Sequence, residues 1–283
     1  MSKVFIKIII LFALIFNFTV KDVFAYKTCS GINPEAYITI KFNDAMIGTD
    51  AAPYIEDGRV FVPLRLIAEL SGMDVNYYPD EKRITITGRN KNIELRICSN
   101  IISVNGIEKY IDAQPVINNG RTMIPLRAVS ENLGIDILWD TSTLSVLLFK
   151  EGARIPDGFV QERHYTDEDL LWLSRIVTAE TGWQSFDAKL AVANVVLNRV
   201  KTKIFPNTIY GVIFDTNYTV QFPPAHKDGF TCLIPTTESI VAAKMALEGV
   251  NNADECLFFN YVPFRSKSIN DLYAIYDGEY FYY

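Results

Sequence analysis

The segment Val62-Pro63-Leu64-Arg65 recurs as Ile124-Pro125-Leu126-Arg127, and both copies lie inside a longer internal repeat. Residues 42–74 align without gaps to residues 104–136 at an offset of 62, with identical residues at 13 of the 33 positions. Self-similarity of this length at a fixed offset indicates that one structural unit has been duplicated.

Each copy of the repeat predicts the same local structures. A turn at Glu56-Asp57-Gly58 precedes a short apolar strand, and Pro63 then stands where a helix can begin, because a proline in the first turn needs no backbone donor. Gly72 stands where a left-handed residue ends that helix. Hairpin strands are expected over residues 75–78, 84–87, 135–139 and 144–149. We therefore expect an α+β module in which small antiparallel hairpins pack on helices.

This duplicated unit resembles the copper amine oxidase N-terminal-like domain over residues 36–150, a module often attached to bacterial exported proteins. Residues 26–150 contain no histidine, and copper(II) sites depend on imidazole ligands. The resemblance therefore implies no copper and no oxidase activity here. We interpret the module as a wall-associating or spacing domain.

The composition narrows the function classes further. The 283 residues are 49% hydrophobic with a net charge of −6, so the chain has material for packed cores but lacks the basic surface typical of nucleic-acid binding. The chain holds two histidines, His164 and His226, whereas a zinc hydrolase usually takes two or three histidine ligands from one site. We expect no nucleic-acid partner, no metal and no cofactor.

The first 25 residues differ from the rest. Lys3 and Lys7 flank the start of an apolar run over residues 8–16, and Val23-Phe24-Ala25 follows as a small-residue exit site. This pattern predicts a signal peptide at 1–25, with no integral membrane segment after cleavage because the run is too short for a comfortable span. A secreted location follows. In an exported protein Cys232 and Cys256 either pair or serve as small buried hydrophobes, and the sequence leaves both open.

After a linker of Gly, Pro and charged residues at 151–165, the pattern changes from strands to helices. Thr166 and Asp169 form a capping-box pattern for a helix that runs to about Glu180. Ser185 caps a second helix over about 187–201, a third begins near Pro235, and strands are expected at 256–260 and 280–283. Residues 166–283 therefore form a second, helix-rich domain.

Glu180 lies on the apolar stripe of the first of these helices. Leu170, Leu173, Val177 and Glu180 are spaced for one face, and Glu180 also lies in the last turn, before Gly182. Burial and the negative end of the helix both disfavour a charged carboxylate. A carboxylic acid that stays protonated near neutral pH is what glycosidic bond cleavage needs as a general acid. The alternative is that Glu180 lies at the edge of the apolar face of the helix and that its carboxyl group is in water.

The residues after Glu180 resemble the SleB-type cell wall hydrolase family of spore cortex-lytic enzymes. The segments that carry this resemblance are Leu190-Ala191-Val192-Ala193-Asn194-Val195-Val196-Leu197-Asn198-Arg199-Val200, Phe205-Pro206-Asn207-Thr208, Gly211-Val212-Ile213-Phe214, Gln221-Phe222 and Phe258-Phe259-Asn260. The resemblance implies a lysozyme-like domain at 166–283 that cuts the glycan strands of peptidoglycan, with Glu180 as its catalytic residue.

Two positions depart from the family pattern. Gln184 stands where the family usually has a second glutamate, and Gly278-Glu279-Tyr280 replaces the usual Gly-x-His. Gln184 keeps its hydrogen-bonding capacity but cannot act as a base, and Tyr280 does not titrate near neutrality. The candidate substrate-binding residues are Gln184, Gln221, Phe222, Asn260 and Tyr280.

The sequence therefore predicts an exported enzyme that cleaves bonds between N-acetylmuramic acid and N-acetylglucosamine in the spore cortex or cell wall. The resemblance implies lytic transglycosylation without a cofactor, in which the muramic 6-hydroxyl attacks and Glu180 accepts its proton. The rivals are a hydrolase that uses water and a non-catalytic wall-binding or spore-coat protein. A peptidase based on Cys232 and His226 is disfavoured, because a cysteine nucleophile normally stands at a helix start.

Overall fold

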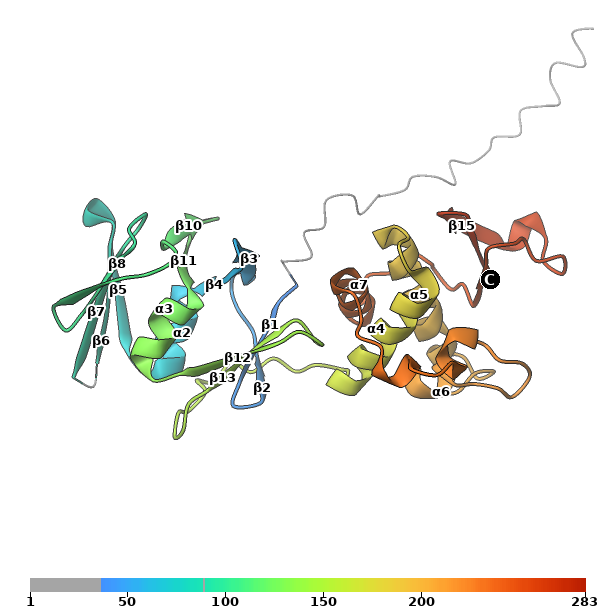
Figure 1. Ribbon diagram of the computed structural model, residues 1–283, viewed down its shortest axis with the longest axis horizontal. Helices are drawn as coiled ribbons and strands as arrows, with labels where there is room; N and C mark the ends of the chain where they lie inside the picture. Colours follow the sequence, from blue (N-terminus) through green and yellow to red (C-terminus); the bar gives the residue numbers. More distant parts are fainter. Residues whose placement is uncertain (1–36, 89) are drawn as a thin grey trace, which may run out of the picture. The chain divides into compact units, whose positions relative to one another are not determined.

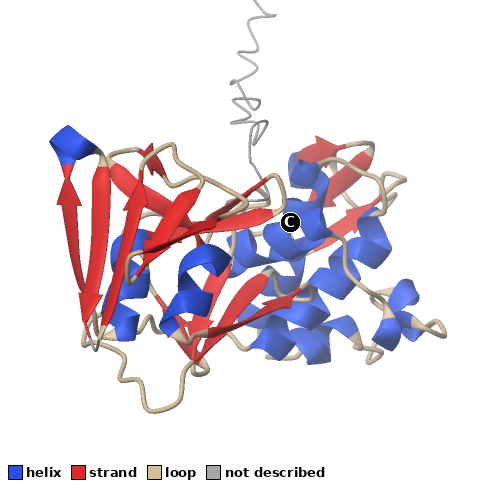
Figure 2. Ribbon diagram, turned by 60° about the vertical axis from the view of Figure 1, so that its left-hand side comes forward, coloured by secondary structure: helices blue, strands red, loops and turns tan. Residues whose placement is uncertain are grey.

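The computed structural model describes residues 37–88 and 90–283. The expected signal peptide at 1–25, together with Cys29 and the first residue of the expected module, Ala36, lies outside these residues. Strands make up most of the structure up to residue 150, and helices dominate between residues 167 and 247 (Figures 1 and 2). The predicted mixed α+β class is confirmed.

The strand-rich segment forms sheets with the orders β12-β13-β1-β2, β10-β11-β4-β3 and β5-β6-β7-β8-β9. Its strands are β1 (Thr39–Phe42), β2 (Ala45–Ile47), β3 (Tyr54–Glu56), β4 (Arg59–Pro63), β5 (Asp74–Tyr78), β6 (Arg83–Gly88), β7 (Lys91–Arg96), β8 (Ile101–Val104), β9 (Ile107–Tyr110), β10 (Val116–Asn118), β11 (Arg121–Pro125), β12 (Asp136–Asp140) and β13 (Ser145–Phe149). Its helices are α2 (Leu64–Ser71), α3 (Leu126–Leu133) and the short 3₁₀ helix η2 (Pro79–Glu81).

Each of the two α-helices starts after a proline and ends at a left-handed glycine. Pro63 precedes α2 and Pro125 precedes α3. Gly72 has φ 70° and Gly134 has φ 66°, and their N–H groups bond to carbonyls of the last helical turn. A residue with a Cβ is strained at such a φ, so glycine is the residue that ends the helix there. The predicted ends of both helices are confirmed.

The two copies of the repeat exchange strands. β4 pairs antiparallel with β11, and Val62 lies opposite Ile124, its equivalent at the offset of 62. A local pseudo-two-fold axis therefore passes between these two residues. One outer sheet joins hairpin β12-β13 of the second copy to β1-β2 of the first. The other joins β5-β6 of the first copy to β8-β9 of the second through β7, so neither copy completes its sheets alone.

Two ion pairs follow the same exchange. Arg59 Nε lies 3.0 Å from Asp112 Oδ2, and Arg121 Nε lies 2.7 Å from Asp50 Oδ2. Each pair joins an arginine of one copy to an aspartate of the other. Because all four side chains are about half exposed, each pair contributes at most about 1 kcal/mol.

Strands β7 to β9 were not predicted from the sequence. Ile93 and Leu95 of β7 are buried while Asn92 and Arg96 are exposed, which is the alternation of a strand with one face on the core. The stretch is short and rich in charged and polar residues, so its two apolar side chains were too few to mark it as a strand.

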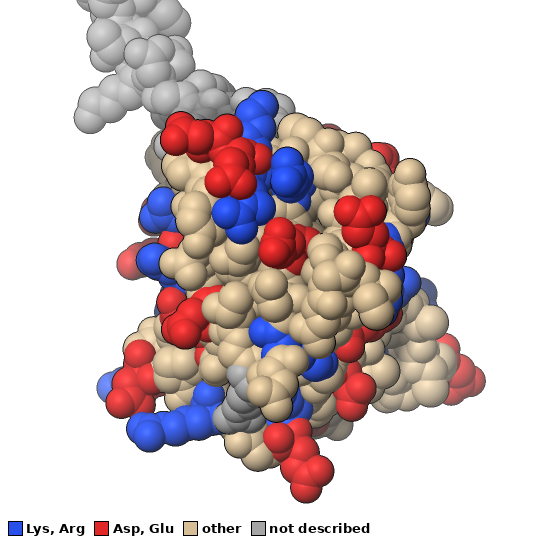
Figure 3. Space-filling model, turned by 90° about the vertical axis from the view of Figure 1, so that its left-hand side faces the viewer, with Lys and Arg blue, Asp and Glu red and all other residues tan. Residues whose placement is uncertain are grey.

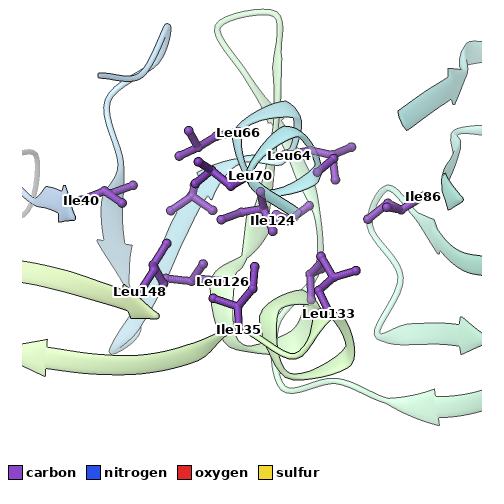
Figure 4. Close-up of a cluster of buried hydrophobic side chains, with 14 of the residues drawn as sticks. Ile40, Leu64, Leu66, Leu70, Ile86, Ile124, Leu126, Leu133, Ile135 and Leu148 are labelled. Atoms are coloured by element: carbon purple, nitrogen blue, oxygen red, sulfur yellow. The ribbon is translucent and has the colours of Figure 1, made fainter. Parts of the chain in front are cut away.

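The apolar side chains of both copies share one core (Figure 4). Leu64 and Leu70 of α2 and Leu126 of α3 lie within it, with Ile40 and Leu148 from the β1–β13 pair. Burial of one such side chain contributes about 1.5–3 kcal/mol, so this cluster is the main source of stability for the segment. The helices of the two copies therefore depend on each other.

The C-terminal segment consists of helices and one small sheet of order β14-β16-β15. Its elements are α4 (Asp167–Thr181), α5 (Phe186–Lys201), α6 (Ile209–Ile213), η3 (Pro223–His226), η4 (Phe230–Cys232), α7 (Thr237–Leu247), β14 (Phe258–Asn260), η5 (Ile269–Asp271), β15 (Leu272–Tyr276) and β16 (Glu279–Tyr282). The Thr166 capping box and the Ser185 cap are both present, which confirms the predicted starts of α4 and α5.

The remaining features are the hydropathy of the helices, the charge of the surface and the state of the cysteines. Over residues 37–88 and 90–283, none of the helices has the length and apolar character needed to cross a membrane. Acidic and basic side chains are interspersed on the face that Figure 3 shows. Cys256 is buried and Cys232 is exposed, and both are free thiols, so the buried-hydrophobe interpretation holds for Cys256 alone.

Candidate active site

Glu180 lies in the last turn of α4, at the wall of an open recess of about 730 Å³. Leu170, Leu173 and Val177 of the same stripe are fully buried, as the spacing predicts. Glu180 itself is half-buried and lines the recess. The loop from Gly182 to Ser185 and Tyr261 line the rest of the recess. This places a carboxyl group where a ligand in the recess can reach it.

The surroundings of Glu180 favour its protonated form. Burial raises the pKa of Glu180 to about 7, against the opposing effect of the positive charges of Arg199 and Lys227. Its Oε1 atom is buried and has no hydrogen-bond partner in the described part of the chain. A carboxyl group with this pKa carries its proton through the mildly acidic range, which general acid catalysis requires.

Arg199 is a buried cation whose charge acts on Glu180. The Arg199 side chain is 4% exposed, its Nε donates to the Leu257 carbonyl at 2.8 Å, and its guanidinium lies 4.9 Å from the centre of the Phe222 ring. Burial lowers the pKa of Arg199 to about 10, opposed by the charges of Asp215 and Glu180. Arg199 therefore connects α5 to the strand region while supplying positive charge near Glu180.

Gln184 lies in the recess, as predicted. Its Nε2 donates to the Tyr261 hydroxyl at 2.8 Å, and its amide favours the Glu279 carboxylate, which opposes the rise in the pKa of Glu279 caused by burial. The residue therefore links the recess wall to strand β16.

The sequence points to Tyr280 on β16, and its neighbour Glu279, which the sequence did not suggest, is the buried one of the two. Adjacent residues of a strand point to opposite faces, and β16 turns Glu279 inward, where it is 1% exposed. Burial, followed by the negative charge of Glu180, raises the pKa of Glu279 to about 7. The sequence feature that could have indicated the burial of Glu279 is its spacing of two residues from Phe281, which is fully buried on the same face of the strand.

The remaining predicted residues lie outside the recess lining. Phe222 is fully buried against Arg199 and Phe259, so the expectation that it binds substrate is corrected: its ring presents no open face. The Gln221 amide donates to the Thr219 carbonyl at 3.2 Å. Asn260 and Tyr280 lie opposite each other in the β14–β16 pair.

Two aromatic side chains at the recess are open to solvent. Trp183 is fully exposed and Tyr261 is 55% exposed, and both line the recess beside Glu180. Exposed aromatic rings next to polar groups provide stacking faces for the apolar sides of sugars. Trp183 was also missed, because a lone tryptophan in a loop gives no periodic signal.

The alternative chemistries find little support. The ring of His226 packs edge-on against Phe214, and Cys232 is an exposed thiol, in contact with Thr231. No cluster of three His, Cys, Asp or Glu side chains suited to a metal occurs among residues 37–88 and 90–283. Because residues 41–148 also contain no histidine, the residues present do not fit a copper site.

Comparisons with known families and proteins agree with both resemblances. Residues 41–148 match the model of the Copper amine oxidase N-terminal domain, and residues 183–281 match that of the Cell Wall Hydrolase family. The chain is 29% identical over 107 residues to the spore cortex-lytic enzyme of Bacillus subtilis, covering 38% of this chain and 32% of the relative. It is 32% identical over 104 residues to that of Bacillus cereus, covering 37% and 35%. The chain thus spans about a third of the length of the curated relatives it matches.

A solved structure also matches part of the chain. It is the catalytic domain of the germination-specific lytic transglycosylase SleB from Bacillus anthracis, with 26% identity, coverage of 46% of this chain and 100% of that chain, and a TM-score of 0.36.

Proposed function

We propose that the chain is a peptidoglycan-cleaving enzyme in which Glu180 is the general acid. The observation that carries the proposal is the half-buried Glu180 carboxyl at the recess wall, with its pKa raised to about 7. The similarity of residues 183–281 to cell wall hydrolases supports a glycan substrate.

The reaction begins at the bond between N-acetylmuramic acid and N-acetylglucosamine. Glu180 protonates the glycosidic oxygen while the bond from the muramic C1 to that oxygen breaks. The muramic 6-hydroxyl forms the new bond to C1 and gives its proton to the Glu180 carboxylate. The products are a 1,6-anhydro end and a free hydroxyl, and no water is consumed.

Transglycosylation and hydrolysis differ in the fate of water. Digestion of peptidoglycan in ¹⁸O-labelled water, followed by mass spectrometry, separates the two reactions. We expect unlabelled products that are lighter by one water than the reducing-end fragments. Incorporation of ¹⁸O at the new muramic end would assign the protein to the hydrolases instead.

The variant Glu180→Gln tests the assignment of the acid. It preserves the shape of the side chain and removes its proton, so cleavage should fall by at least about a hundredfold. Glu255→Gln, which changes an exposed carboxyl of the same segment, is the matched control and should keep the parental rate. If both variants cleave normally, another residue is the acid. If the parent releases no fragments from any peptidoglycan, the chain is a wall-binding protein.

Location and substrate type belong to the same proposal. We infer export through residues 1–25, action on spore cortex, and a division into module 36–150, linker 151–165 and catalytic domain 166–283. The module would hold the enzyme on the wall. Deleting 36–150 should then reduce the rate on intact sacculi more than on soluble glycan fragments, with circular dichroism confirming that the shortened protein is folded. Equal losses on both substrates would argue against a wall-associating role.

A further inference from the structure

We propose that Glu279 is a positioning residue of the glycan-cleaving site, a second buried carboxyl whose charge is coupled to the protonation of Glu180 in the cluster around Gln184. The proposal rests on the proposed function, since it assigns the residue that controls the protonation of the general acid. It also explains the buried carboxyl on β16 for which the reaction scheme has no use.

The backbone fixes Glu279 next to the recess. Strands β15 and β16 are joined by Asp277 (φ 49°) and Gly278 (φ 84°), a two-residue turn that starts β16 at Glu279. The Asp277 carboxylate accepts a hydrogen bond from the backbone N–H of Ser185, the residue that caps α5. The hairpin is therefore attached to the loop that carries Gln184, and Glu279 follows directly after that attachment.

The side chains of this cluster leave polar atoms unsatisfied. Glu180 Oε1, Gln184 Oε1 and Glu279 Oε2 are all buried and, within the described residues, have no hydrogen-bond partner. Buried polar atoms without partners are costly and mark sites where a proton, water or substrate group completes the network. Three such atoms on neighbouring side chains point to a site that binds a hydroxyl or holds a proton.

The charges around the two carboxyls are unequal. Glu180 feels the positive charges of Arg199 and Lys227, and Arg199 is itself balanced by Asp215. Glu279 feels the negative charges of Glu180 and Asp277, and Tyr261 lies in the same negative field. Among the described groups around it, the Gln184 amide is the one that stabilises the Glu279 carboxylate.

Two neighbouring carboxyls with similar affinities for a proton titrate as a pair. Loss of the first proton makes loss of the second harder, because the second ionisation would place two negative charges together in a buried site. The pair therefore keeps one proton over a wide pH range. During that interval Glu180 is protonated for part of the time and remains able to act as the acid.

The pH dependence of kcat/KM in the full-length protein provides the test. The parent should lose activity on the alkaline side in two steps, whereas Glu279→Gln should lose it in one step, with a midpoint about one pH unit lower. KM should stay nearly constant, since Glu279 does not line the recess. Glu279→Asp, which restores a carboxyl, should recover part of the alkaline activity, and Glu255→Gln should match the parent.

A second readout does not depend on activity. ¹³C NMR of labelled glutamate carboxyls should show that the Glu279 midpoint falls in Glu180→Gln and that the Glu180 midpoint falls in Glu279→Gln. Midpoints unchanged within about 0.2 unit would overturn the coupling. Shifted midpoints with an unchanged pH–rate profile would overturn the catalytic consequence. Should Glu180→Gln remain active, the proposed function fails, and the NMR titration still decides whether the carboxyls are coupled.

Discussion

A carboxyl group becomes an acid catalyst through what surrounds it, and burial is the main influence that raises the pKa of Glu180 to about 7. The stripe from Leu170 to Glu180 places Glu180 correctly because helical spacing is a strong local signal. The position of Glu279 depends on the pairing of β16 with β14 and β15. Its proximity to Glu180 is therefore a property of the tertiary structure, which the local sequence does not show. Tyr280 and Glu279 are one residue apart, which in a strand is the difference between the two faces.

Trp183 tests substrate recognition at the residue scale. Trp183→Ala removes a fully exposed ring at the recess, so KM for glycan fragments should rise about three- to tenfold, with little change in kcat or melting temperature. Tyr218→Ala is the matched control, because Tyr218 is 90% exposed and does not line the recess. Equal effects of the two variants would remove Trp183 from the binding site.

The buried carboxyls also set the pH dependence of stability. The pKa values of Glu180 and Glu279 are raised from 4.5 to about 7 in the folded protein, so the native state holds these protons more tightly than the unfolded chain does. The penalty for burying their charged forms is therefore absent below about pH 4, and stability falls as the pH rises towards 7 and stays lower above it. Glu279→Gln should raise the unfolding free energy by about 1–3 kcal/mol at pH 8 and leave it unchanged at pH 4. Denaturant titrations at both pH values measure this difference.

At the scale of elements, local signals predicted the ends of helices better than they predicted strands. Pro63, Gly72, Thr166 and Ser185 mark their helix ends through the chemistry of single residues, and all four are confirmed. Strands β7 to β9 were not predicted. A short strand rich in charged residues is defined by its pairing with neighbouring strands, which its own sequence pattern does not show. The predicted order of hairpins said nothing about which copy each strand would join.

The β15–β16 turn offers a test at this scale. Gly278 has φ 84° and open space around it, so Gly278→Ala introduces backbone strain without a collision. We expect a loss of about 1 kcal/mol in stability. The rate of glycan cleavage should also fall, because the turn positions both Asp277 and Glu279. An unchanged rate in a destabilised variant would show that the turn does not position the site.

At the scale of the whole molecule, the exchange of strands between the two copies explains why the module cannot be halved. Val62 and Ile124 pair across the local axis, and the Arg59–Asp112 and Arg121–Asp50 pairs cross it in opposite directions. A contact in which each partner offers the same residues to the other is the isologous contact of a two-fold dimer. The module therefore has the internal geometry of a two-fold dimer held within one chain. A protein containing a single copy is expected to associate in pairs in a concentration-dependent way, whereas here the two copies are joined by a covalent link.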